Sequence, residues 1–167
     1  LSESQSLKNA QNVVDFLYVT DRDWSKESLS AMIGNMRHES SVNPNMYEYG
    51  QDWAADRGFG LVQWTPRSKY WNWALQNGYS EEQLRDGNAQ LDRIDFEVDN
   101  NIQYIANGHE IRYGKGTKYN FSFADFRKNK EGLNVDQLTE AFMWNYEGPN
   151  YTKALESLAS RQAFSNK

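Results

Sequence analysis

The apolar residues of the chain recur mainly with the period of an α-helix. The clearest stripe has members at i, i+3, i+4 and i+7, namely Leu29, Met32, Ile33 and Met36. The next position of this stripe is occupied by Glu39, and Pro44 disfavours helical backbone at the residue before it. The pattern therefore predicts a core-facing helix that begins near Trp24 or Ser25 and ends near Glu39.

Helical periodicity and capping signals extend over most of the remaining chain. Asn134 and Gln137 have the spacing of a capping box, and so do Ser80 and Gln83. Further helices are expected at residues 1–20, 66–77, a short stretch after 80, 89–106, 122–128, 135–146 and 152–159. The Gly- and Lys-bearing residues 109–119 are expected to form a loop.

Two short runs of β-forming residues depart from this helical pattern. Residues 46–49 and 59–64 flank a polar connection, so a small antiparallel β-hairpin is expected between them. The predicted fold class is α+β, predominantly helical, with the hairpin segregated from the helices. No repeat or low-complexity linker divides residues 1–167, which are expected to form a single domain. The start at Leu1 indicates a domain excised from a longer protein.

Composition narrows the classes of partner and of chemistry. The net charge of −5 argues against nucleic acid and against an anionic membrane surface as partners. The absence of cysteine excludes disulfides, thiolate zinc sites and a cysteine nucleophile. His38 and His109 lack metal-ligand spacing, so no metal or other cofactor is expected. The aromatic content of 14% fits either a Trp-rich core or a groove on which sugar rings stack.

These exclusions leave catalysis by carboxyl groups, and Glu39 is the best candidate for the catalytic residue. A carboxyl group on the buried stripe of a helix is desolvated, and the helix C-terminus disfavours negative charge, so both effects raise its pKa. A general acid requires a proton held in this way at neutral pH. The alternative is that Glu39 turns its side chain to solvent.

A second carboxyl group could come from the loop that follows. Glycoside hydrolysis uses two carboxyl groups, one to protonate the leaving oxygen and one on the far side of the sugar. Asp52 and Asp56 are the candidates for this second role, and Glu48 lies nearby in the sequence. An N-acetyl sugar could instead use its own amide, with no second carboxylate.

Three segments of the chain resemble the motifs of a known superfamily. Glu39-Ser40-Ser41-Val42-Asn43-Pro44 and Gly58-Phe59-Gly60-Leu61-Val62-Gln63-Trp64-Thr65-Pro66 are similar to the catalytic segments of goose-type lysozymes and lytic transglycosylases. The later residues 141–149 resemble the aromatic, Tyr-containing segment of the same superfamily. The phage tail lysozyme family is the closest resemblance, because it shares the motifs Gly-Asn-Met-x-x-Glu-Ser and Gly-Phe-Gly-Leu-Val-Gln-Trp-Thr-Pro.

The resemblance implies a lysozyme-like fold with the hairpin beside an active-site cleft, and it assigns roles to residues. Glu39 would be the general acid, and Asp52 or Asp56 the second catalytic carboxylate. Gln63 would contact substrate from the cleft wall, and Tyr146 would support the reacting sugar or Glu39. The remaining substrate-binding candidates are Trp64 and Phe59.

The implied activity is that of a muramidase, which cleaves the β-1,4 bond between N-acetylmuramic acid and N-acetylglucosamine in bacterial peptidoglycan. A lytic transglycosylase is an alternative, although the sequence around Tyr146 is Asn-Tyr-Glu-Gly rather than the Tyr-Asn-x-Gly of transglycosylases. The other alternative is a non-catalytic domain that binds the cell wall or has a structural role in a phage tail. The resemblance places the protein at the cell wall, either tail-associated on a virion or released by lysis, together with other domains of a tail or cell-wall hydrolase protein.

Overall fold

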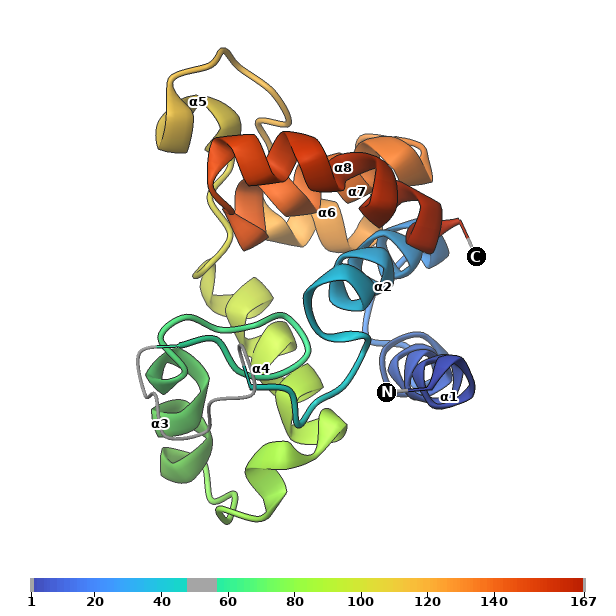
Figure 1. Cartoon of the computed structure of the whole chain (residues 1–167), viewed down its shortest axis with the longest axis vertical. Helices are drawn as coiled ribbons and strands as arrows, with labels where there is room; N and C mark the ends of the chain where they lie inside the picture. Colours follow the sequence, from blue (N-terminus) through green and yellow to red (C-terminus); the bar gives the residue numbers. More distant parts are fainter. Residues whose placement is uncertain (1, 48–56, 167) are drawn as a thin grey trace.

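The described part of the protein is built from helices (Figure 1). A computed structural model describes residues 2–47 and 57–166. The α-helices are α1 (Glu3–Val14), α2 (Lys26–Ser40), α3 (Ser68–Gln76), α4 (Gly87–Asn100), α5 (Gly108–Tyr113), α6 (Phe123–Lys128), α7 (Val135–Phe142) and α8 (Tyr151–Ser165). Two π-helical turns, η1 (Asp15–Val19) and η4 (Met143–Glu147), extend α1 and α7, and a 3-10 turn, η3 (Gln83–Arg85), precedes α4. The predominantly helical prediction is confirmed.

Helix α2 is the central element and matches the predicted apolar stripe. It packs against α7 and α8, with α6 also in contact. Leu29, Met32 and Met36 are buried, and Ile33 is half-buried at the edge of the stripe. Ser25 caps the helix, since its hydroxyl accepts a hydrogen bond from the Ser28 amide at 3.0 Å. The helix end that carries Glu39 is therefore anchored in the core.

The close approach of α2 to α8 depends on Gly34. A Cβ at this position would lie 1.8 Å from Ser165 Oγ and 2.6 Å from the carbonyl oxygen of Arg161. Since no side chain fits into that space, glycine allows the two backbones to pack directly. This contact fixes the position of α8, and with it Arg161, relative to the end of α2.

Helix α4 organises the part of the molecule that contains α3 and packs against α1, α3 and α6. Its Glu97 side chain is fully buried and accepts hydrogen bonds from Trp64 Nε1 at 3.0 Å, Tyr146 Oη at 2.5 Å and Arg93 Nε at 3.1 Å. Burial raises the pKa of Glu97 to about 7. These bonds join residues 59–64 to the η4 turn through α4.

The predicted β-hairpin is wrong for the residues that the structure describes. Pairing there is limited to isolated bridges that join Phe59 to Tyr47 and to Trp64. Residues 59–64 fold back on themselves, because the backbones of Phe59 and Trp64 exchange hydrogen bonds of 3.0 and 3.1 Å. Gly60 and Gln63 both have positive φ angles, of 88° and 56°. A tight turn thus occupies the run that was predicted to be a strand.

Several predicted boundaries also shift, and α3 begins at Ser68 without the predicted side-chain cap, while the two predicted capping boxes are present. Helix α4 ends at Asn100 because Asn101 adopts a left-handed conformation, and α8 continues to Ser165. The predicted loop after residue 108 instead begins with α5. Reciprocal capping hydrogen bonds are present in both predicted boxes, at Ser80 with Gln83 and at Asn134 with Gln137. None of the described helices has the length and apolar character needed to cross a membrane.

Candidate active site

A cavity of about 650 Å³ opens beside the C-terminal end of α2. Four segments of the chain form it: the end of α2, residues 46–47, residues 63–65, and the stretch from the end of η4 to the start of α8. Its lining residues are His38, Glu39, Met46, Tyr47, Gln63, Thr65, Glu147, Gly148, Pro149, Asn150 and Lys153. The cavity therefore brings Glu39 and Gln63, both predicted as site residues, into one site and adds the carboxyl group of Glu147.

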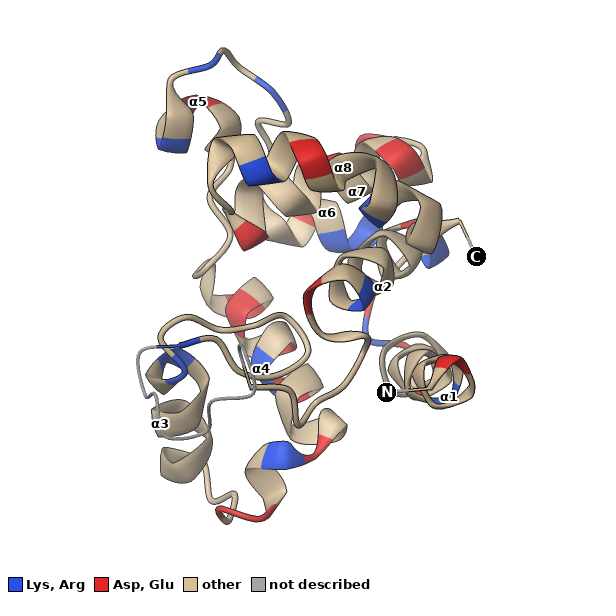
Figure 2. Ribbon diagram, in the orientation of Figure 1, with Lys and Arg blue, Asp and Glu red and all other residues tan. Residues whose placement is uncertain are grey.

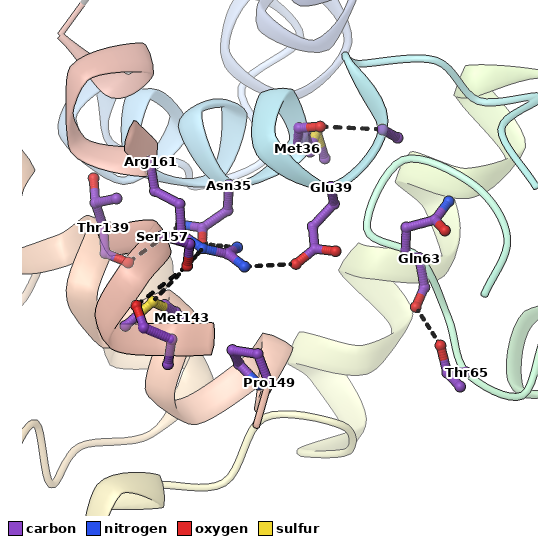
Figure 3. A network of polar contacts seen from close by, with 12 residues as sticks. Asn35, Met36, Glu39, Gln63, Thr65, Thr139, Met143, Pro149, Ser157 and Arg161 are labelled. Carbon is purple, nitrogen blue, oxygen red and sulfur yellow. Dashed lines mark hydrogen bonds and ion pairs between the residues drawn. The ribbon is translucent and has the colours of Figure 1, made fainter. Parts of the chain in front are cut away.

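Glu39 lies between the α8 side of the cavity and the segment that carries Gln63 (Figure 3). Its Oε1 accepts a hydrogen bond from Arg161 Nη2 at 2.8 Å, and its side chain is 20% exposed. The prediction that burial and the helix C-terminus hold a proton on Glu39 did not include this arginine. A guanidinium group at that distance forms a charge-assisted hydrogen bond with the Glu39 carboxyl group.

Arg161 is itself fixed by a network that joins three helices (Figure 3). The residue is 1% exposed, and besides Glu39 it donates to Ser157 Oγ at 3.0 Å and to Asn35 Oδ1 at 2.8 Å. The Asn35 amide in turn donates to the carbonyl oxygen of Thr139 on α7 at 3.2 Å. Because the guanidinium is held from α2 and α8, it presents its remaining donor to Glu39 in a fixed direction.

Glu147 is a carboxyl-bearing residue of the cavity that the sequence analysis did not select. It ends the η4 turn, and its Oε1 is buried without a hydrogen-bond partner among residues 2–47 and 57–166. Burial raises the pKa of Glu147 well above its usual range, and the charge of Glu39 raises it further, against the opposing effect of Arg161. Glu147 therefore tends to keep its proton beside the ion pair of Glu39 with Arg161. In the sequence, Glu147 could have been found from the segment Asn-Tyr-Glu-Gly, which differs from the Tyr-Asn-x-Gly of transglycosylases.

Gln63 lies in the cavity wall, as predicted, and its side chain is half-buried. The amide nitrogen donates to the carbonyl oxygens of Met46 at 3.0 Å and Gly60 at 2.9 Å, so the side chain also holds the turn together. A Cβ on Gly58 would lie 2.9 Å from Gln63 Oε1, which explains the need for a small residue there.

The other predicted substrate-binding side chains lie beneath the cavity wall. Phe59, Trp64 and Tyr146 are 0%, 1% and 1% exposed and pack into the core. Their burial gives them a supporting position in this structure, and their contact with substrate stays a prediction. Trp64 and Tyr146 hold the wall through their shared hydrogen bonds to Glu97. Asp52 and Asp56 lie outside the described residues.

The polar residues around the cavity give it a mixed charge. His38 and Lys153 line it together with the two glutamates. Burial and the nearby charge of Arg161 lower the pKa of His38, which Glu39 partly offsets. In the view of Figure 2, Lys and Arg are interspersed with Asp and Glu rather than gathered into one basic face. Among the described residues, no three His, Asp or Glu side chains are grouped as a metal site.

Comparison with known proteins places the chain in a family. Residues 8–167 match the sequence model of the phage tail lysozyme family. Over 149 residues, the chain is 37% identical to "Morphogenesis protein 1" of Bacillus phage B103, an alignment that covers 89% of this chain. The same alignment covers 36% of that relative, so the chain spans about a third of its length. The match over nearly its whole length shows that this chain belongs to the phage tail lysozyme family.

Proposed function

We propose that this chain is a muramidase, which hydrolyses the β-1,4 bond between N-acetylmuramic acid and N-acetylglucosamine in bacterial peptidoglycan. The family suggests a lysozyme-like cell-wall hydrolase with a place in a phage tail. The observation that carries the finer assignment is the position of Glu39 on the wall of a 650 Å³ cavity that holds a second carboxyl group. Most glycoside hydrolases act with a pair of carboxyl groups.

In this proposal Glu39 protonates the glycosidic oxygen. As the C–O bond breaks, positive charge develops on the sugar ring, and Glu39 becomes a carboxylate that Arg161 stabilises at 2.8 Å. Asp52, Asp56 or the substrate amide remains a candidate for stabilising the ring charge. Gln63 contributes to the cavity wall against which the glycan lies.

The cellular setting follows from the same family. The substrate is the glycan strand of peptidoglycan, and the site of action is the bacterial wall, reached from a virion tail or after release by lysis. Since a relative extends well beyond the aligned region, we propose that this domain works alongside other domains of one tail protein. Neither nucleic acid nor a membrane surface has a role in the proposal.

The variant Glu39→Gln tests the assignment. Release of reducing ends from purified peptidoglycan should fall by about 10²–10⁴-fold, because the amide cannot donate the proton of a carboxylic acid. Glu156→Gln, an exposed change on α8, is the matched control and should retain the wild-type rate. Retention of full activity in Glu39→Gln would remove Glu39 from the mechanism. Anhydro-sugar products from the wild-type protein would identify a lytic transglycosylase instead.

A further inference from the structure

We infer that Glu147 is a second functional carboxyl group of this site and shares a single proton with Glu39. The inference rests on the proposed function, in which Glu39 must carry a proton when it meets the glycosidic oxygen. In the free protein Glu39 forms an ion pair with Arg161 at 2.8 Å, which occupies its Oε1. The site therefore needs a nearby group that holds the proton, and Glu147 lines the same cavity.

The backbone around Glu147 is held on both sides. The carbonyl oxygen of Tyr146 accepts a hydrogen bond from Gln103 Nε2 at 3.2 Å, and the Gly148 amide donates to Met143 at 2.9 Å. Gly148 has a φ angle of 54°, and a Cβ there would overlap the guanidinium of Arg112. The turn that follows the η4 helix is thus fixed, and it sets Glu147 in the wall of the cavity.

Charges of both signs surround Glu147 and determine which of Glu39 and Glu147 holds the proton. The groups that act on it or line the same cavity are Glu39, Arg161, Glu97, Arg112, Tyr146, His38 and Lys153. Arg161 is committed to Glu39, and Arg112 donates to the carbonyl oxygen of Asn145 at 2.9 Å. Glu147 Oε1 has no hydrogen-bond partner among the described residues, unlike Glu39. Of the two carboxyl groups, Glu147 is the one that keeps the proton at rest.

Over one turnover, Glu39 and Glu147 together give up one proton and take up one proton. In the reactive form the proton has moved through the cavity water from Glu147 to Glu39, which leaves the net charge unchanged. Glu39 gives that proton to the glycosidic oxygen, whose bond to the sugar carbon breaks with its electron pair. Water then adds to the sugar carbon, and the proton that it releases is taken up by the Glu147 carboxylate. The site returns to ionised Glu39 and protonated Glu147.

The rate of peptidoglycan hydrolysis as a function of pH tests this inference. In Glu147→Gln, Glu39 is the remaining carboxyl group of the pair and keeps its ion pair with Arg161. The rate at pH 7 should fall at least about tenfold, and the residual activity should peak at a lower pH than that of the wild-type protein. Glu147→Asp retains a carboxyl group, so its pH profile should resemble that of the wild-type protein, at a lower rate.

Controls for folding and for charge accompany this experiment. Thermal unfolding of each variant identifies those that are folded at the assay temperature, and Glu156→Gln serves as the control for the charge change. Wild-type rate and pH profile in Glu147→Gln, with Glu39→Gln inactive, would overturn the shared proton but leave the proposed function standing. Full activity in Glu39→Gln would instead refute the proposed function itself. If Glu147→Gln does not fold, a pH profile of Glu147→Asp displaced to low pH would overturn the inference.

Discussion

Substitution of Arg161 by Met tests the network that holds Glu39. Methionine keeps much of the buried volume but removes the guanidinium, so Asn35 Oδ1, Ser157 Oγ and Glu39 Oε1 each lose a donor. Removing one partner of a buried ion pair costs about 3–5 kcal/mol. Because the Glu39 side chain is 20% exposed and water can partly replace its partner, we expect the lower end, about 3 kcal/mol.

Denaturant unfolding at pH 7 measures this loss, and a double-mutant cycle separates its parts. In Arg161→Met the midpoint of thermal unfolding should fall by roughly 6–12 °C. Adding Glu39→Gln removes the unpaired charge and should recover about 1–2 kcal/mol of the loss. An Arg161→Met variant within about 1 kcal/mol of the wild-type stability, with no coupling to Glu39, would show that the network does not hold the Glu39 carboxyl group.

Two further predictions concern the packing and the polar core beneath the site. Gly34→Ala should lower the stability by several kcal/mol and reduce hydrolysis, because a Cβ 1.8 Å from Ser165 Oγ forces α8 away from α2; wild-type unfolding in denaturant would contradict this packing account. Burial raises the pKa of Glu97 from 4.5 to about 7, so its contribution to stability is complete below pH 4.5 and is lost as the pH rises through 7. The free energy of unfolding should therefore fall by up to about 3 kcal/mol between pH 5 and pH 8, and Glu97→Gln should flatten this pH dependence in the same denaturant titrations. An equally steep dependence in Glu97→Gln would assign it to other groups.

The parts of the structure that sequence predicts well are those decided by local interactions. The stripe on α2, the Ser25 cap and the capping box at Asn134 depend on residues within one or two turns of each other. They placed Glu39 correctly at the end of a core helix. The composition of the aromatic residues was compatible with a core, and Phe59, Trp64 and Tyr146 are indeed buried there.

The parts that sequence did not predict depend on contacts between distant segments. Arg161 is 122 residues from Glu39, and no local pattern connects them. Glu147 reaches the cavity only because η4 packs against α7 and α8, which brings its end to the cavity beside the end of α2. The run at 59–64 is predicted to be a strand because it contains β-forming residues next to turn signals, whereas burial and the positive φ at Gly60 and Gln63 accompany a turn.

Mass spectrometry of the fragments released from purified peptidoglycan, by the wild-type protein and by Glu39→Gln, tests the central claim most directly. The account predicts that the wild-type protein releases fragments ending in reducing N-acetylmuramic acid, each heavier by one water than the corresponding anhydro product. It also predicts that Glu39→Gln, folded as judged by its unfolding transition, releases about 10²–10⁴-fold less. Anhydro fragments, or equal release by the two proteins, would contradict it.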